Sequence, residues 1–348
     1  MRKEYNSIVL IGRFQPVHNA HVAMLRRARD LADRVIVVLG SANQPRTVKN
    51  PFTVDERTNL IRQAWYHIAP VDDHLRIVAV EDNIYNDQAW AVAVQNAVAP
   101  HTVTEPDGKR SVAIIGHVKD ESSYYLKMFP QWKFVDQDEV EPLHAADMRK
   151  LYFTKTPNTN FFKGVAPDST VSFLERFATT EDFEQLVREK EFIDTYKKQY
   201  ASLPYEPVFV TADAVVIQSG HVLMIKRRSE PGKGQLALPG GFLNAKTDRS
   251  MESAMFRELY EETGIKVPEK VLRGNIKRTR VFDAIERSTR GRTITHAFCI
   301  VLPEGEWALP KLKAGDDAAD AFWQPISTLD RSHCFEDHYS IIQYFLGR

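Results

Sequence analysis

Two histidines three residues apart follow a short apolar run near the start of the chain. Residues 7–12 read SIVLIG, and the next nine read RFQPVHNAH. Residues i and i+3 of a helix share a face, so His18 and His21 at a helix start would point the same way. The first helical turn attracts phosphate through its unpaired N–H groups and its dipole. Two imidazole donors there would stabilise charge growing on a phosphorus centre, and Arg13 would hold an anionic leaving group. The alternative is that both histidines are cap or surface residues.

Three glutamates and an arginine crowd another short stretch, residues 257–265, which reads RELYEETGI. In a helix, Glu258, Glu261 and Glu262 gather on one side, and Arg257 can pair with Glu261 at i+4. Crowded carboxylates repel unless a cation lies among them, and oxygen ligands suit Mg²⁺ or Mn²⁺. Metal-bound water beside a pyrophosphate held by the same ions would hydrolyse a phosphoanhydride. The alternative is an ordinary salt-bridged helix.

Strand-like and helical patterns alternate up to about residue 150. This alternation predicts βαβ units, and hence a doubly wound α/β domain whose parallel sheet is covered on both faces. In such a sheet ligands bind beyond the carboxyl ends of the strands. The expected strands lie at residues 7–12, 34–41, 75–80, 111–115 and 132–135, with a helix near 19–32.

The pattern changes after a charged helical stretch, residues 168–200, and the segment ASLPYEP (201–207). We expect a second domain there, of α+β type with a mixed sheet. Its signals are a hairpin within 208–228 joined at Ser219-Gly220, a strand pair at 276–285 and 293–302, and helices at 249–263 and 335–346. The predicted domains are residues 1–180 and 206–348, with a helical linker at 181–205.

Length and composition restrict the class of protein. A chain of 348 residues with 43% hydrophobic residues is long enough for two globular domains. It has no apolar run near the roughly 20 residues that a bilayer requires, and no signal-peptide pattern at its start. The two cysteines, Cys299 and Cys334, suit a reducing cytoplasm, which is the expected location. A formal net charge of zero argues against a nucleic-acid partner but not against small anionic ligands.

The GRFQPVHNAH stretch resembles the HxGH signature of the nucleotidylyltransferase superfamily. Its GRFQP opening is most similar to the archaeal-type nicotinamide mononucleotide (NMN) adenylyltransferases. The resemblance implies a Rossmann-like sheet, Mg²⁺, and the joining of NMN to ATP to give NAD and pyrophosphate. Ala20 replaces the family glycine, and its small side chain retains close approach of the backbone to a nucleotide.

Four later segments resemble the same family: residues 40–57, 81–90, 116–130 and 143–150. Ala145 and Ala146 stand where the family has hydroxyl residues, so any hydrogen bond made there is lost or comes from the backbone. The resemblance implies phosphate or nucleotide contacts from Lys49, Gly116, Lys119 and Arg149, besides Arg13, and stacking of nicotinamide on Trp90. The alternatives are a solvated Lys49, a core Trp90, a plain turn at Gly116 and a surface charge at Arg149.

Residues 238–265 resemble the Nudix box, G-x5-E-x7-R-E-U-x-E-E-x-G-U, where U is aliphatic. RELYEETGI matches every fixed position, Gly241 matches the first glycine, and Gly264 would end the helix. The resemblance implies metal ligation by Glu258, Glu261 and Glu262, catalytic roles for Arg257 and Glu258, and substrate contacts at Gly240 and Gly241. In relatives the substrates are nucleoside diphosphates linked to another moiety, often ADP-ribose, which is cleaved to AMP and ribose 5-phosphate.

The loop of this box departs from the pattern because it is two residues longer. Counting from either end puts Thr247 or Arg249 at the first glutamate, and neither is acidic, although Asp248 and Glu252 are near. That glutamate usually supports the loop or the box arginine, so metal binding is expected to survive. A catalytic base outside the box cannot be placed from spacing. Glu286 and the stretch FEDH (335–338) are possible, or purely structural.

Both motif sets in this order resemble the bifunctional NMN adenylyltransferase/Nudix hydrolase family. The expected ligands are ATP, NMN, NAD and ADP-ribose, with Mg²⁺ or Mn²⁺, and a homo-oligomer is left open. Three alternatives remain. The first domain could use another phosphate acceptor, the second could be a non-hydrolytic sensor of ADP-ribose or NAD-like ligands, or the protein could be an interaction scaffold.

Overall fold

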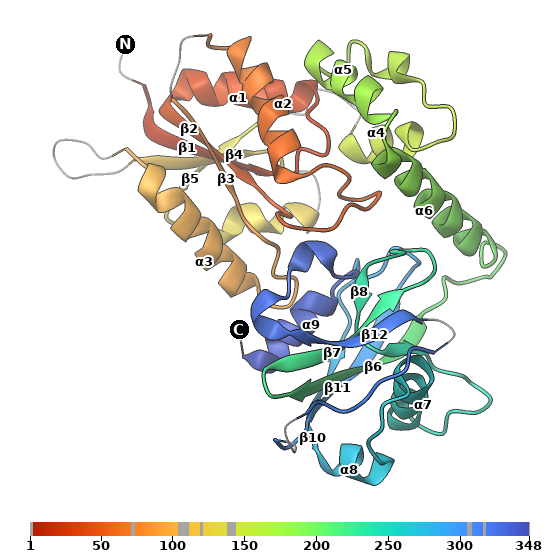
Figure 1. Ribbon diagram of the computed structural model, residues 1–348. Coiled ribbons are helices and arrows are strands. Elements are labelled where there is room, and N and C mark those ends of the chain that lie inside the picture. Colours follow the sequence, from red (N-terminus) through yellow and green to blue (C-terminus); the bar gives the residue numbers. More distant parts are fainter. Residues whose placement is uncertain are drawn as a thin grey trace. The chain divides into compact units, whose positions relative to one another are not determined.

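The chain forms two compact units, Met1–Val187 and Arg188–Arg348, called unit 1 and unit 2 below (Figure 1). The computed structural model describes residues 3–70, 74–103, 111–118, 121–137, 144–304, 308–315 and 318–347. The division falls within one helix, α6 (Glu181–Lys198), which covers most of the stretch expected as a linker. The domain limits expected from the sequence, at residues 180 and 206, stay predictions.

Unit 1 is built on a parallel sheet with strand order β3-β2-β1-β4-β5. The prediction of a doubly wound α/β fold is confirmed, and each expected strand is present within two residues at either end. The order reverses beside β1, so the loop that leaves β1 lies where such sheets bind ligands. The strands are β1 (Tyr5–Gly12), β2 (Ala32–Leu39), β3 (Leu75–Ala79), β4 (Val112–Gly116) and β5 (Lys133–Asp136).

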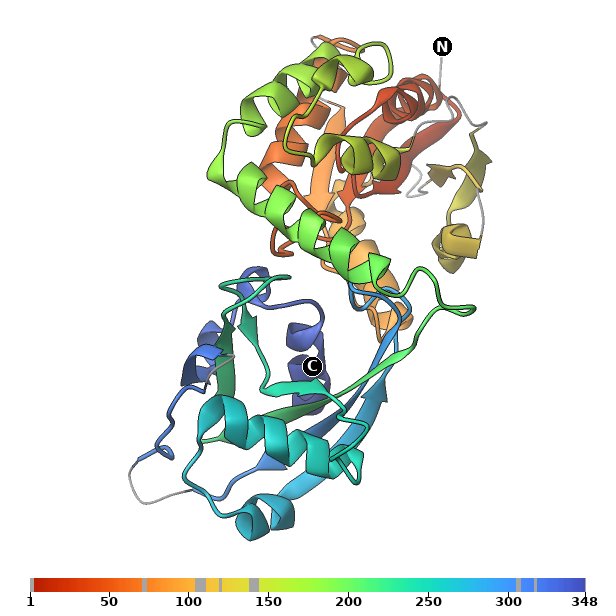
Figure 2. The same ribbon diagram turned by 90° about the vertical axis from the view of Figure 1, so that its right-hand side faces the viewer.

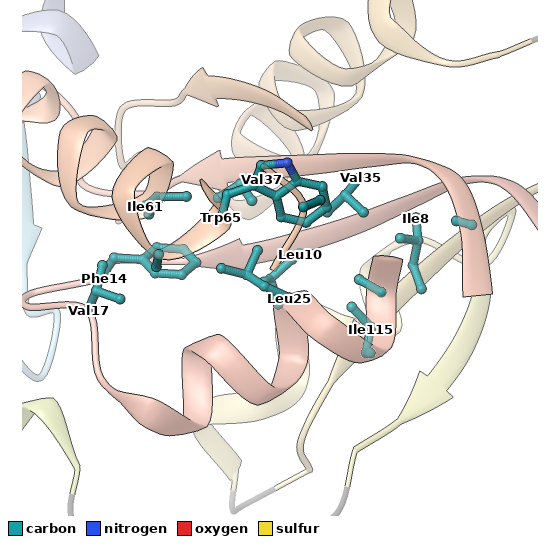
Figure 3. Packing of buried hydrophobic residues seen from close by; sticks show 14 of the residues in the cluster. Ile8, Leu10, Phe14, Val17, Leu25, Val35, Val37, Ile61, Trp65 and Ile115 are labelled. Carbon is teal, nitrogen blue, oxygen red and sulfur yellow. The ribbon is translucent and has the colours of Figure 1, made fainter. Parts of the chain in front are cut away.

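Helices cover both faces of this sheet because alternate strand residues point to opposite sides. Ile8 and Leu10 face α1 and α2, whereas Val9 and Ile11 face α3. Figure 3 shows the first face, where Leu25 of α1 and Trp65 of α2 lie over the strands. The helices of unit 1 are α1 (Asn19–Leu31), α2 (Val54–Tyr66), α3 (Asp87–Val98), α4 (Ala145–Tyr152) and α5 (Asp168–Phe177), with short 3₁₀ turns η1 (Ala99–His101), η2 (Glu121–Met128) and η3 (Thr159–Phe162).

Unit 2 has a mixed sheet in the order β10-β11-β6-β7-β12, with β8 beside β7 and β9 beside β6. β6 and β11 are parallel, and the other pairs are antiparallel. This confirms the expected mixed sheet and both expected strand pairs. The strands are β6 (Phe209–Gln218), β7 (His221–Arg227), β8 (Leu236–Ala237), β9 (Gly240–Phe242), β10 (Ile276–Phe282), β11 (Thr293–Val301) and β12 (Ala318–Pro325).

Two helices pack on opposite faces of this sheet (Figure 2). α7 (Met251–Thr263) packs on the face that carries Ala214 and Phe298. α9 (His338–Leu346) packs through Phe345 against Phe282, which pairs with Thr295 and therefore faces away from Phe298. The remaining helical pieces are α8 (Glu269–Gly274), η4 (Ile326–Thr328) and η5 (Arg331–His333). No helix in the described part of either unit is long and apolar enough to span a membrane.

Local sequence sets the ends of these elements. Ser219 and Gly220 both have positive φ, 46° and 73°, which is what a two-residue hairpin turn needs. Ser250 begins α7 by accepting a hydrogen bond from the Ser253 N–H, and Gly264, at φ +50°, ends it in the left-handed region. The helix that carries the glutamate cluster is therefore fixed at both ends.

Candidate active sites

The loop after β1 brings the two histidines together in unit 1. A Cβ atom on Gly12 would lie 3.0 Å from the Phe14 ring, so glycine lets this ring turn back over the strand end. The centres of the His18 and His21 rings are 3.8 Å apart, at the start of α1. The His18 N–H lies 3.3 Å from Nδ1 of His21 and donates to it, which leaves the His21 proton on Nε2.

Both imidazoles are electrically neutral near pH 7. Burial, with a smaller contribution from nearby His144, lowers the pKa of His18 to about 4. Burial, with a contribution from His18, holds the pKa of His21 well below its usual range. His18 is 7% exposed, and its Nδ1 has no hydrogen-bond partner among the described residues. A polar atom in that state is a candidate ligand contact.

Two buried side chains fix this loop to the segment that contains NPFT. The Gln15 amide donates to the Phe52 carbonyl at 3.0 Å and accepts from the Phe52 N–H at 2.9 Å. Arg57, 1% exposed, donates from Nη1 to the carbonyls of Arg13 and Gly40, each at 2.8 Å. Arg57 therefore joins the carboxyl ends of β1 and β2. Arg57 was not among the predicted site residues, although it is the final residue of the family-like NPFTVDER segment.

Removing the Arg57 side chain is expected to destabilise unit 1. Arg57→Leu would leave two buried carbonyls without a charged donor, and we expect the free energy of unfolding to fall by about 3 kcal/mol. Urea unfolding followed by circular dichroism measures this. Arg62→Leu, an exposed position on the same helix, is the matched control and is expected to change stability by less than about 0.5 kcal/mol. Equal stability of the two variants would contradict the role given to Arg57.

Three guanidinium groups gather around the histidine loop. Arg149 of α4 donates from Nη1 to the Gln15 carbonyl at 2.7 Å, which places it beside the histidine loop, and its contact with phosphate stays a prediction. Burial, with a smaller contribution from nearby Arg13, lowers the pKa of Arg149 to about 10. Burial also lowers the pKa of Arg57 to about 10, and Arg13 again contributes. Like charges held this close favour an anionic ligand.

The other residues expected in unit 1 have different surroundings. Trp90 packs against Phe129, with ring centres 6.0 Å apart, so part of its ring belongs to the core. A Cβ atom on Gly116 would come within 2.8 Å of Leu126, which explains the glycine by packing. Lys49 is half-buried in the loop between β2 and α2. Lys119 lies outside the described residues. Nucleotide contacts from these four residues stay predictions.

In unit 2 the Gly240–Gly241 turn lies directly against acidic side chains. A Cβ atom on Gly240 would collide with Asp213, and one on Gly241 would collide with the Glu258 carboxylate. The Gly240 N–H donates to Oε2 of Glu262 at 2.9 Å. Only glycine at both positions allows the backbone to approach the carboxylates this closely.

Arg257 organises the cluster, and Asp248 supplies the acid that spacing alone could not place. The guanidinium donates to both oxygens of Asp248, at 3.0 and 2.9 Å. Its Nη1 donates to Glu258 at 2.8 Å and to Glu261 at 2.9 Å, which confirms the expected i+4 pair. Asp248 thus supports Arg257 from the extended loop, and the Arg257 hydrogen bond lowers the pKa of Asp248. The two extra loop residues are accommodated without loss of this support.

The carboxylates of this cluster have raised pKa values. Burial raises the pKa of Glu262 to about 8, and Glu258 and Asp213 add to the effect. Burial also raises the pKa of Glu258; the hydrogen bond and charge of Arg257 oppose this effect, and Glu261 and Asp248 add smaller contributions that raise the pKa. This is a donor set that a divalent cation would stabilise in its ionised form.

The carboxylates of Glu258, Glu261 and Glu262 do not converge on a single position. No group of three or more His, Cys, Asp or Glu residues in the described ranges is placed to hold a metal ion. Glu258 and Glu261 bind Arg257, and Glu262 binds the Gly240 N–H. Metal ligation by the three glutamates therefore requires rotation of their side chains, and it stays a prediction.

The FEDH stretch lies beside the same turn. His338 accepts the Leu238 N–H on Nδ1 at 2.8 Å, and Asp337 binds Arg287 through two hydrogen bonds of 2.8 and 2.9 Å. The side chain of Glu336 is 8% exposed and accepts from the Thr289 N–H at 3.2 Å. These contacts give the stretch a structural role, and they leave the identity of a catalytic base open. Glu286 is exposed.

Two family models divide the chain between them. Residues 9–201 match the cytidylyltransferase-like family, and residues 208–345 match the NUDIX domain. In the first half, 185 residues are 36% identical to a nicotinamide/nicotinic acid mononucleotide adenylyltransferase of Acinetobacter baylyi; the match covers 53% of this chain and 92% of the relative. In the second half, 137 residues are 34% identical to an ADP-ribose pyrophosphatase of Methanocaldococcus jannaschii, covering 39% of this chain and 72% of that protein.

Two solved structures match both halves at once. They are crystal structures of a bifunctional NMN adenylyltransferase/ADP-ribose pyrophosphatase from Francisella tularensis, one of them complexed with AMP and a manganese ion. Sequence identity is 33% and 34%, TM-scores are 0.88 and 0.90, and each match covers 99% of this chain and 99% of the other. With the two motif sets in the same order on the same two folds, the chain belongs to the bifunctional NMN adenylyltransferase/ADP-ribose pyrophosphatase family.

Proposed function

We propose that this protein makes and recycles NAD-related nucleotides with two separate sites. Unit 1 transfers AMP from ATP to NMN, giving NAD and pyrophosphate, and unit 2 hydrolyses ADP-ribose to AMP and ribose 5-phosphate. The observation that carries the proposal is that each unit has a cluster of side chains suited to a different phosphate ligand. Neutral imidazoles ringed by guanidinium groups suit a triphosphate, whereas buried carboxylates with raised pKa values suit a metal-bound pyrophosphate.

In unit 1 the reaction is an in-line displacement at the α-phosphorus of ATP. A phosphate oxygen of NMN forms the new bond to this phosphorus while the bond to the β-phosphate bridging oxygen breaks and pyrophosphate leaves. His18 and His21 donate N–H groups to the oxygens on which charge grows. Arg13 and Arg149 hold the phosphates in position, which lowers the entropic part of the barrier. The protein needs no nucleophile of its own.

In unit 2 the chain's residues position a pyrophosphate and a water molecule. A divalent cation held by Glu258, Glu261 and Glu262 would neutralise phosphate charge and make water a better nucleophile near neutral pH. The family relative crystallised with manganese supports a divalent ion, and Mg²⁺ is the other candidate. Arg257, oriented by Asp248, fixes the directions of Glu258 and Glu261.

Product analysis tests both reactions. The purified chain is given ATP and Mg²⁺ with NMN, nicotinic acid mononucleotide or phosphopantetheine, and separately ADP-ribose, and the products are identified by ³¹P NMR. We expect pyrophosphate and a dinucleotide with the first acceptor, and AMP with ribose 5-phosphate from ADP-ribose. Transfer to phosphopantetheine alone would overturn the acceptor assignment. Tight binding of ADP-ribose without metal-dependent turnover would make unit 2 a sensor.

Asp248 provides a sharper test of the unit 2 site. Asp248→Asn removes the charge that orients Arg257, and we expect ADP-ribose hydrolysis to fall by about 10- to 100-fold, the usual effect of losing an outer-sphere partner. Steady-state kinetics at saturating Mg²⁺ measures it. Glu252→Gln, which changes a carboxylate that binds Arg273 instead, is the matched control and should retain most activity. If both variants hydrolyse ADP-ribose equally well, Asp248 does not replace the box glutamate.

A further inference from the structure

A cavity of about 290 Å³ lies near the amino-terminal ends of the strands of unit 1. Val112, the first residue of β4, lines this cavity and pairs in register with Ser7 of β1. A parallel strand rises about 3.3 Å per residue, so Gly12, where the histidine loop begins, is about 16 Å further along β1. The cavity is therefore separate from the histidine site, and neither proposed reaction uses it.

An indole ring that is fixed by the core lines one part of the cavity. Trp132, the residue before β5, is stacked on Phe129, with ring centres 4.5 Å apart and planes 12° apart. The Trp132 N–H of the backbone also donates to the Phe129 carbonyl at 3.0 Å. Phe129 is 1% exposed and packs in turn against Trp90. Trp132 is therefore a rigid surface on which a further flat ring can stack.

Two carboxamides and a hydroxyl supply polar atoms to the same cavity. Gln95 comes from α3 and Gln131 from the segment before β5, and neither side chain hydrogen-bonds to another residue that the structure describes. The Thr102 hydroxyl donates to the Ala99 carbonyl at 2.9 Å, which leaves its lone pairs able to accept. A glutamine carboxamide has a donor beside an acceptor, so it pairs with adjacent donor and acceptor atoms on the edge of a base such as adenine.

The charge and the size of the cavity select the class of ligand. Its other described lining residues, Val98, Ala99 and Val112, are apolar, and none of the described lining residues carries a charge. An ionised group buried there would lose hydration without gaining a partner, which favours a neutral ring. A cavity of roughly 150 Å³ holds one benzene ring. About twice that volume accommodates the two fused rings of a purine, whereas a single ring would leave part of the lining without contacts.

We propose that this cavity is an additional nucleoside site, which binds a purine ring stacked on Trp132. The edge of the purine forms hydrogen bonds with the carboxamides of Gln95 and Gln131. The site goes beyond both proposed reactions, because it contains none of the residues assigned to them. A purine bound there leaves the histidine loop free for ATP, since the cavity lies at the other end of the strands.

A titration that observes Trp132 itself tests the site. Adenosine is added to the full chain labelled with fluorotryptophan, and fluorine NMR follows each tryptophan separately; Trp132→Phe identifies the resonance of Trp132. We expect a saturable shift of this resonance. Gln95→Ala and Gln131→Ala should each weaken the affinity about five-fold, the usual effect of losing one hydrogen bond. Asn96→Ala is the matched control, because Asn96 is exposed on the same helix and does not line the cavity, and its affinity should equal that of the wild type.

Adenosine bound at another site can move the Trp132 resonance only indirectly, and the glutamine variants separate the two cases. Equal affinities for Gln95→Ala and Asn96→Ala, in proteins that melt like the wild type, would overturn the proposal. An unshifted Trp132 resonance at millimolar adenosine would overturn it as well. If Gln95→Ala fails to fold, Gln131→Ala decides, because Gln131 is exposed. Nicotinamide, which has a single ring, tests the size argument: tighter binding of nicotinamide than of adenosine at Trp132 would contradict a purine site.

Discussion

Replacing Glu262 by glutamine is expected to lower ADP-ribose hydrolysis by about 1000-fold while NAD synthesis stays within about two-fold of the wild type. Glu262 is the most buried of the three box glutamates and accepts the Gly240 N–H. The amide keeps the shape of this side chain but not its charge, so it cannot balance a divalent cation among the other carboxylates. A loss of several kcal/mol of metal-dependent stabilisation corresponds to about three powers of ten in rate.

The measurement is kcat for both reactions on the same preparation of Glu262→Gln. Glu269→Gln is the matched control, because Glu269 lies on α8 and binds Arg273 on the surface. It is expected to leave both activities near the wild-type values. Retention of more than a tenth of the hydrolytic rate by Glu262→Gln would show that the box carboxylates do not hold the essential metal.

Replacing His18 by alanine is expected to produce the opposite pattern. NAD synthesis should fall by about 100- to 1000-fold, the usual effect of removing one donor to a developing oxyanion, and hydrolysis should be unchanged. His18 is the donor with the strongest case, since it is buried and its Nδ1 has no partner in the described part of unit 1. Its lowered pKa keeps it neutral, so the loss reflects a hydrogen bond rather than a fixed charge.

Initial rates of NAD formation at saturating ATP and NMN measure this effect. His67→Ala, an exposed histidine that follows α2, is the control and should behave as the wild type. The binding of ATP should weaken less than kcat falls, because the contact strengthens as charge develops. A normal kcat for the His18→Ala enzyme would show that the histidine pair takes no part in the reaction.

The fold was largely predictable because its strands carry strong local signals. Strands buried on both faces are continuous apolar runs, which is why β1 and β2 were found. β12 was missed because it pairs only with β7 on the path of the sheet, and most of its residues are partly or fully exposed. Such an edge strand lacks the apolar run that identifies a central one. The two-residue strand β8 is likewise too short to produce a pattern.

The candidate sites were predictable where their residues are close in sequence. Helical spacing placed Arg257 beside Glu261. His18 also lies beside His21 as predicted, although it caps α1 with an extended backbone instead of belonging to the helix. Contacts made across loops could not be predicted from helical spacing. Asp248 could not be chosen by counting, because the path of a loop with two extra residues determines which side chain reaches Arg257.

Long-range contacts are the second reason for incomplete prediction. Arg57 bonds carbonyls at residues 13 and 40, which meet only because β1 and β2 are adjacent in the sheet. Arg227 and Arg290 lie on different strands and loops, and Phe335 brings them together from a third segment. Contacts of this kind depend on the folded chain and leave no local signal in the sequence.

Diffraction from crystals grown with ADP-ribose, Mn²⁺ and a non-hydrolysable ATP analogue tests the central claim most directly, since manganese can be located by its anomalous signal. We predict manganese within coordination distance of the Glu258 and Glu262 carboxylates in unit 2, and the triphosphate beside His18 and His21 in unit 1. Nucleotide or metal bound away from these residues in either unit would contradict the account.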